Sequence, residues 1–164
     1  MNKPLVSIVM NCFNGEKFLK RALKSIINQK YENWELIFCD NLSTDQSKNI
    51  FLDFKDKRFK YYCSEKFKRL YDARNDALKK CEGEYISFLD IDDYWYEEKL
   101  NKQIQLMEKN KNIGLVYSNF LIVNMNKFFF KKKKINTKLF RSGIINENLI
   151  KNYFIGLLIV MIRK

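Results

Sequence analysis

Short apolar runs alternate with amphipathic segments over the first 119 residues of the chain. The runs are rich in β-branched and aromatic residues, which is typical of buried strands. They predict strands at residues 5–10, 34–39, 59–63, 85–89 and 114–119. Between them, apolar residues recur every three or four positions and predict helices at 18–27, from about 44 to 54, and at 71–81 and 96–109. This alternation predicts an α/β fold, a Rossmann-like, mainly parallel sheet with flanking helices.

Three residues are expected to mark helix ends. Asn14 and Ser43 stand just before the first two helical patterns, where a side-chain oxygen can cap free N–H groups. Gly83 follows the third pattern, and glycine commonly ends helices. We therefore expect Asn14 and Ser43 as N-caps and Gly83 as a helix stop.

The pattern weakens beyond residue 119. Residues 120–140 contain runs of phenylalanine (128–130) and lysine (131–134), and they fit either a hairpin or an amphipathic segment on a membrane surface. Residues 144–152 predict a short helix, and residues 154–162 predict a final strand, which is too short to span a bilayer. We divide the chain into an α/β domain (1–119) and a basic region (120–164).

The charge of the chain is concentrated in its last third. The formal net charge is +12, and residues 101–164 hold 13 basic and two acidic residues. Such a surface suits anionic lipid headgroups, nucleic acid or phosphorylated ligands. A solvated lysine-rich face is the commoner reading of a charge run.

The histidine and cysteine content excludes several kinds of site. With no histidine, the chain cannot use a Ser-His-Asp or Cys-His mechanism or a histidine-ligated metal. Its four cysteines stand far apart without a Cys-x-x-Cys pair, which argues against zinc and against a disulfide framework. We expect free thiols in a reducing cytosol.

Three acids follow the strand predicted at 85–89 directly, namely Asp90, Asp92 and Asp93. Carboxylates this close repel one another unless a cation or a proton relieves them. Mg²⁺ or Mn²⁺ holding phosphate oxygens fits that need. The alternative is that the acids cap the helix predicted from Tyr96.

Polar residues also follow two other predicted strands. Asn11 follows the first strand, and Asp40 and Asn41 follow the second. The carboxyl ends of parallel strands share one edge of a sheet, and ligands bind in the crevice there. The sequence therefore predicts a nucleotide-type crevice at this edge.

Five segments, in this order and spacing, resemble the family-2 nucleotide-sugar glycosyltransferases of the A-type fold. They are residues 6–14, 19–29, 34–45, 73–77 and 83–95, and residues 152–156 and 160–164 resemble part of that family's downstream half. The resemblance implies a nucleotide-sugar donor, a UDP-, GDP- or dTDP-sugar with UDP favoured. It also implies Mg²⁺ or Mn²⁺ at an Asp-x-Asp motif formed by Asp90 and Asp92, with Asp92 the main ligand.

The same resemblance assigns roles to four further residues. Asn11 would meet the nucleoside, and Asp40 and Asn41 occupy a pair that usually recognises base and ribose. Arg74 matches a basic residue near the base or diphosphate. Asn41 departs from the family pattern, which has an acid there, so the base preference is open.

The resemblance further implies transfer with inversion to a glycan or a lipid-linked cell-surface precursor. Such an enzyme needs a carboxylate general base, which the family places after a strand matching residues 160–163. We expect the base beyond Lys164, because only Glu108 and Glu147 are acidic after residue 100 and neither fits. The chain would then be a truncated enzyme. The alternative is a nucleotide-binding module without transfer activity.

The basic region raises two further expectations about partners. It would place a cytoplasmic protein peripherally at the anionic inner face of the membrane. Nucleic-acid binding, with residues 128–130 stacking on bases, ranks last because no nucleic-acid motif accompanies the basic cluster.

Overall fold

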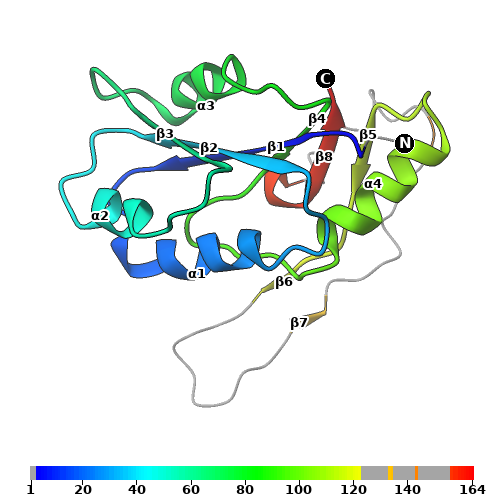
Figure 1. Ribbon diagram of the computed structural model, residues 1–164, viewed down its shortest axis with the longest axis horizontal. Helices are drawn as coiled ribbons and strands as arrows, with labels where there is room; N and C mark the ends of the chain where they lie inside the picture. The colour runs from blue at the N-terminus through cyan, green and yellow to red at the C-terminus, as the bar shows by residue number, and fades with distance from the viewer. Residues whose placement is uncertain (1–2, 123–132, 135–142, 144–155) are drawn as a thin grey trace.

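The computed structural model describes residues 3–122, 133–134, 143 and 156–164. A six-stranded sheet with the order β3-β2-β1-β4-β8-β5 forms its centre (Figure 1). Its strands are β1 (Val6–Cys12), β2 (Trp34–Asp40), β3 (Phe59–Cys63), β4 (Tyr85–Phe88), β5 (Leu115–Tyr117) and β8 (Val160–Arg163). All five strands predicted in the first 119 residues are present.

The sheet is mainly parallel, as predicted, with one strand reversed. β1 pairs in parallel with β2 and β4, and β2 pairs in parallel with β3. β8 lies antiparallel between β4 and β5. The sheet thus takes one strand from beyond residue 119. This strand is shorter than the one predicted at 154–162, because the 3₁₀ turn η2 (Leu157–Ile159) precedes it; residues 154 and 155 lie outside the described residues.

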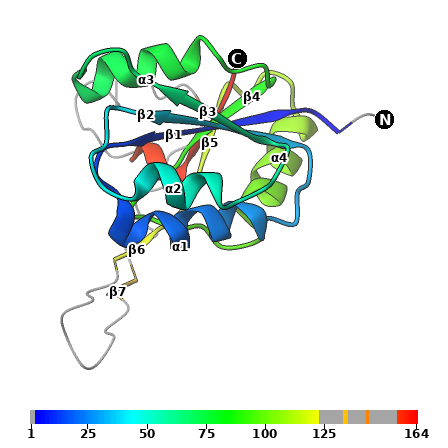
Figure 2. The ribbon, with the colours of Figure 1, turned by 60° about the vertical axis from the view of Figure 1, so that its left-hand side comes forward.

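Helices cover both faces of the sheet. α1 (Glu16–Ile27), α2 (Ser47–Leu52) and α4 (Lys99–Lys109) lie on one face, and α3 (Leu70–Leu78) lies on the other (Figures 1 and 2). The apolar stripe of α1 packs into the larger core, with Leu19, Leu23 and Ile26 fully buried. Ala73 and Ala77 are the buried residues of α3, and such small side chains let this helix approach the sheet closely.

The two predicted N-caps are wrong. The N-cap of α1 is Gly15, and that of α2 is Gln46. Asn14 and Ser43 instead connect the loops that follow β1 and β2: Asn14 Oδ1 accepts a hydrogen bond from Thr44 N (2.8 Å), and Ser43 Oγ accepts one from Asn14 N (3.0 Å). These hydrogen bonds link the loop after β1 to the loop after β2, because the two parallel strands end side by side.

Gly83 is also not a helix stop. α3 ends at Leu78, five residues earlier. A Cβ atom on Gly83 would lie 2.6 Å from Ser7 N and 2.7 Å from Leu5 O. Glycine is needed there because the chain crosses the backbone of the β1 segment without room for a side chain.

β6 (Leu121–Ile122) and β7 (Lys133–Lys134) form an antiparallel pair outside the main sheet. The pairing agrees with the hairpin alternative for residues 120–140. The phenylalanine run 128–130, Lys131, Lys132 and the helix predicted at 144–152 lie outside the described residues. Within the described ranges, the structure contains no helix with the length and apolarity needed to cross a membrane.

Candidate functional site

The carboxyl ends of the parallel strands meet at one edge of the sheet, as predicted. Asn41 N donates a hydrogen bond to Cys12 O (2.8 Å), and Leu89 N donates one to Val9 O (3.1 Å). Ser64 N, after β3, donates one to Asp40 O (2.8 Å). The loops that carry the predicted site residues are therefore joined directly by their main chains.

The side chain of Asp40 is hydrogen-bonded to neighbouring parts of the protein. Its carboxylate is buried and accepts hydrogen bonds from Ser43 N (2.8 Å) and Tyr61 Oη (2.7 Å). Burial, followed by this hydrogen bond and the negative charge of Asp40, raises the pKa of Tyr61. In this structure Asp40 orders the end of β2, and any contact with a ligand would add to that role.

The side chain of Asn41 is also hydrogen-bonded within the protein. Its Nδ2 donates to Lys68 O (2.8 Å), and its Oδ1 accepts from Lys68 N (3.0 Å). The carboxamide therefore pairs with the main-chain N–H and C=O of one residue in the β3–α3 loop, and it holds that loop against the end of β2.

Asn11, by contrast, has a side-chain amide whose N and O atoms are buried. Neither Nδ2 nor Oδ1 forms a hydrogen bond with any residue that the structure describes. A buried amide left unpaired costs about 1–3 kcal/mol, so it normally pairs with protein, water or ligand. Asn11 therefore has hydrogen-bonding capacity to spare at the carboxyl edge.

Arg74 and Asp90 are brought together from α3 and the end of β4. Arg74 Nη2 lies 2.6 Å from Asp90 Oδ1, and the two side chains are 20% and 43% exposed. A guanidinium group this close to the crevice also offers donors to a phosphate.

The acidic cluster brings three carboxylates together, and one of them, Asp90, is paired with Arg74. Asp93 N donates to Asp90 O (3.1 Å), so the acids form a turn, and the Asp92 side chain is exposed. Burial, followed by the charges of Asp92 and Asp90, raises the pKa of Asp93. The capping alternative is wrong, because α4 begins only at Lys99 and its N-cap, Glu98, forms no side-chain capping hydrogen bond.

These acids fit one kind of metal site. Among the described residues, no group of three or more His, Cys, Asp or Glu forms a ligand set. A Mg²⁺-type ion is commonly held by one or two carboxylates plus substrate phosphates rather than by a protein cage. Exposed Asp92, beside two further carboxylates, matches such an ion arriving with a diphosphate.

An exposed aromatic pair flanks the same edge. Phe13, after β1, and Phe67, in the β3–α3 loop, meet edge to face with ring centres 5.0 Å apart. They are 47% and 61% exposed. Neither ring was predicted as a site residue, although Phe13 follows the first predicted strand by only three positions.

Glu108 does not supply a general base at this edge. Glu108 lies near the end of α4 and accepts hydrogen bonds from Tyr85, the first residue of β4, and from Lys111 (2.8 Å). It therefore faces the amino edge of the sheet. Glu147 lies outside the described residues.

Comparisons with known proteins agree with this architecture. The family model described as glycosyl transferase family 2 matches residues 7–164. The Escherichia coli protein WfgD, named a UDP-Glc:alpha-D-GlcNAc-diphosphoundecaprenol beta-1,3-glucosyltransferase, is 39% identical over 99% of this chain and 61% of its own length. E. coli WfaP, which carries the same activity name, is 40% identical over 72% of this chain and 47% of its own. The chain thus spans less than two thirds of these relatives.

Solved structures with a similar fold include S. aureus TarS. One TarS structure aligns with a TM-score of 0.72 and 22% identity over 96% of this chain and 28% of TarS. The structure of TarS 1-349 in complex with UDP-GlcNAc aligns with a TM-score of 0.60 and 29% identity, over 63% of this chain and 31% of that one. The mixed six-stranded sheet with flanking helices is therefore shared with these proteins.

Proposed function

The chain belongs to glycosyl transferase family 2, and from this membership we propose that it binds a nucleotide-diphospho-sugar at the carboxyl edge of its sheet and serves sugar transfer. The observation that carries the proposal is the buried, unpartnered carboxamide of Asn11 at that edge. A bound nucleoside would supply the hydrogen bonds that Asn11 lacks.

A UDP-hexose is the donor that we propose. The two E. coli relatives are named for UDP-Glc, and a similar TarS structure holds UDP-GlcNAc. The exposed ring of Phe13 offers a stacking surface for the base. Asp40 and Asn41 would then act on the nucleoside mainly through the loops that they hold in place.

We propose that Mg²⁺ or Mn²⁺ binds with the diphosphate at Asp92, with Asp90 beside it. When bound, such an ion would neutralise the charge that develops on the departing nucleoside diphosphate. The chain's own contribution is to place these carboxylates on a fixed turn and to hold Arg74 next to Asp90, 2.6 Å away. Arg74 can then turn its donors toward the phosphates.

The acceptor that we propose is a glycan on a lipid diphosphate, since both E. coli relatives are named for a diphosphoundecaprenol acceptor. Transfer would proceed by in-line displacement with inversion at the anomeric carbon. An anionic membrane surface is the place where such an acceptor would be met. We assign no general base among the described acids.

A second candidate is nucleotide binding without transfer by these 164 residues. The observation that favours it is the position of Glu108, whose carboxylate is bound by Tyr85 and Lys111 at the opposite edge of the sheet. The two candidates share a donor site, and they differ in whether UDP-glucose and a lipid diphosphate acceptor yield product.

The first test is calorimetric titration of UDP, GDP and dTDP into wild type and Asp92→Asn, with and without Mn²⁺. We expect UDP to bind most tightly, and Mn²⁺ to strengthen its binding about tenfold or more in wild type only. Asp53→Asn is the matched control, because Asp53 is an exposed acid at the end of α2 and makes the same change in charge.

Binding that is equal with and without Mn²⁺ would contradict the metal proposal alone. Absence of binding by all three nucleotides would contradict the donor site itself. A loss of Mn²⁺ dependence in Asp53→Asn as well would point to a general effect of charge.

A further inference from the structure

A polar stripe on α1 holds the loop that carries the acidic cluster. Arg21, Ser25 and Gln29 follow one another at intervals of four residues, so they lie on one side of the helix and its end. Ser25 Oγ accepts a hydrogen bond from Trp95 N (3.1 Å). Gln29 Nε2 donates to Tyr96 O (2.9 Å), and Gln29 Oε1 accepts from Leu100 N (3.1 Å).

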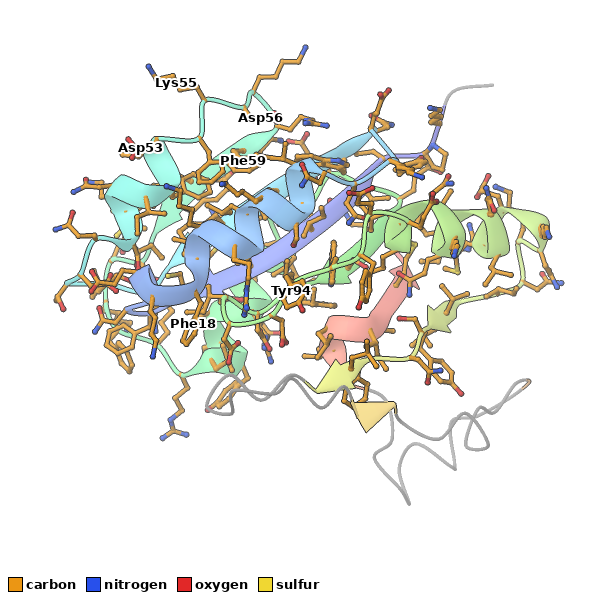
Figure 3. The ribbon with its side chains drawn as sticks, turned by 90° about the horizontal axis from the view of Figure 1, so that it is seen from below. Phe18, Asp53, Lys55, Asp56, Phe59 and Tyr94 are labelled. Carbon is orange, nitrogen blue, oxygen red and sulfur yellow. The ribbon has the colours of Figure 1, made fainter. Side chains whose placement is uncertain are left out.

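Arg21 is the member of the stripe nearest the acids. Its Nη2 donates to Asp92 O (3.1 Å), and its guanidinium carbon lies 4.6 Å from the ring centre of Tyr94. Figure 3 labels Tyr94 beside α1, where the loop passes the helix. Arg21 thus contacts both the main chain of Asp92 and the ring of Tyr94.

We infer that Arg21 is a positioning residue that fixes the main chain at Asp92, so that the carboxylate stands ready for a divalent ion bound with the donor diphosphate. The inference rests on the proposed function. It assigns Arg21 no contact with the substrate.

The local structure explains why a side-chain contact is needed to hold the main chain at Asp92. Residues 89–98 contain no helix or strand, so side-chain contacts must fix their path. The planar guanidinium combines a directed hydrogen bond with stacking on Tyr94, which fixes both position and orientation. A loop that is ordered before binding loses less conformational entropy when the ligand arrives.

Within the stripe, Ser25 and Gln29 support the fold, whereas Arg21 positions the loop that carries the acids. Ser25 and Gln29 are buried, and their loss would remove the hydrogen bonds that join α1 to residues 95–100. Arg21 is only partly buried at the edge of the stripe. Its substitution should therefore change the acid loop while the fold remains.

The first measurement is the UDP dissociation constant of wild type, Arg21→Gln and Arg21→Lys, with and without Mn²⁺. We expect Arg21→Gln to weaken UDP binding about tenfold with Mn²⁺ and less than twofold without it. Arg21→Lys keeps a cation and a donor and should fall between them. The control is Lys24→Gln, which removes an exposed positive charge three residues along α1 and should behave as wild type.

The second measurement follows the loop without any ligand. The chain has two tryptophans, Trp34 and Trp95. In a Trp34→Phe variant, the tryptophan fluorescence comes from Trp95 alone. Trp95 is 6% exposed and adjoins Tyr94, whose ring Arg21 contacts. Arg21→Gln should raise acrylamide quenching of Trp95 at least twofold, and Lys24→Gln should leave it unchanged.

Each result decides a separate question. Unchanged Mn²⁺-dependent UDP binding in Arg21→Gln would overturn the inference and leave the donor site standing. An equal loss with and without Mn²⁺ would also overturn it, since Arg21 would then act on the nucleotide directly. Absence of UDP binding in wild type would remove the proposed function, and this inference with it.

Discussion

The carboxamide of Asn41 forms two hydrogen bonds with the main chain of Lys68, one in each direction. This pairing gives a physical reason for an amide at a position where the resemblance described above implies an acid. A carboxylate could still accept from Lys68 N, but it could not donate to Lys68 O.

We predict that Asn41→Asp lowers the free energy of unfolding by about 1–3 kcal/mol, because it leaves Lys68 O unpaired and faces it with a second acceptor. Urea denaturation at neutral pH is the measurement. Asn112→Asp makes the same change in charge at an exposed position and should stay within about 0.5 kcal/mol of wild type. An Asn41→Asp variant as stable as wild type would show that the β3–α3 loop does not depend on this pairing.

Asp90 and Arg74 form an ion pair, which would compete with a bound phosphate for the guanidinium group under the proposed function. We predict that Asp90→Asn binds UDP about three- to tenfold more tightly than wild type without metal, because Arg74 is released toward the diphosphate. With Mn²⁺ the gain should disappear, since a carboxylate beside Asp92 is lost. Calorimetry under both conditions tests this, and weaker binding in the absence of metal would refute it.

Gly83 lies against the backbone that leads into β1, so Gly83→Ala places a methyl group within 2.6 Å of Ser7 N. Backbone atoms in a sheet cannot move aside, and overpacking of this kind should cost about 3 kcal/mol or more. Thermal and urea unfolding measure the loss. Gly114→Ala is the control, because a Cβ atom there would meet nothing within 4 Å, and its effect should be within about 0.5 kcal/mol.

Lys99 is a partly buried lysine at the start of α4. Its Nζ donates to Gln103 Oε1 (2.8 Å) and Ser87 Oγ (3.2 Å), and it lies 4.0 Å from the centre of the Trp95 ring. Burial lowers the pKa of Lys99 to about 7. In the unfolded chain the same group titrates near its ordinary value of about 10.4.

The direction of the resulting pH effect follows from linkage. Between about pH 7 and pH 10 the unfolded chain binds a proton at Lys99 that the folded chain does not, so stability rises with pH over this window. Below pH 7 both states are protonated, and the cost of burying the charge is fully present. The Gln103 contact and the Trp95 ring favour the ammonium ion and reduce the size of the effect.

We predict that Lys99→Met is more stable than wild type at pH 7, and that this advantage shrinks by about 1–2 kcal/mol by pH 9. Urea unfolding of both proteins at the two pH values tests this, and taking their difference cancels the other titrating groups. Lys102→Met, at an exposed position on the same helix, should have the same free energy of unfolding as wild type at both pH values. A constant gap between Lys99→Met and wild type would mean that Lys99 keeps its ordinary pKa.

Much of the fold was readable from the sequence because its signals are local. Apolar runs and helical periodicity located every strand of the first 119 residues and the four helices, and the parallel sheet followed from their alternation. The convergence of Asn11, Asp40, Asn41 and Asp90 at one edge also followed, since the carboxyl ends of parallel strands share an edge.

Tertiary structure decided what those residues do there. The antiparallel insertion of β8, the pairing of Asn41 with Lys68, the Arg74–Asp90 ion pair and the hold of Arg21 on Asp92 all join residues distant along the chain. No periodicity encodes such contacts, because they depend on which loops the folded sheet brings together. Local sequence signals thus specify the elements and the edge where they meet, whereas three-dimensional packing leaves Asn11 without a hydrogen-bond partner among the described residues.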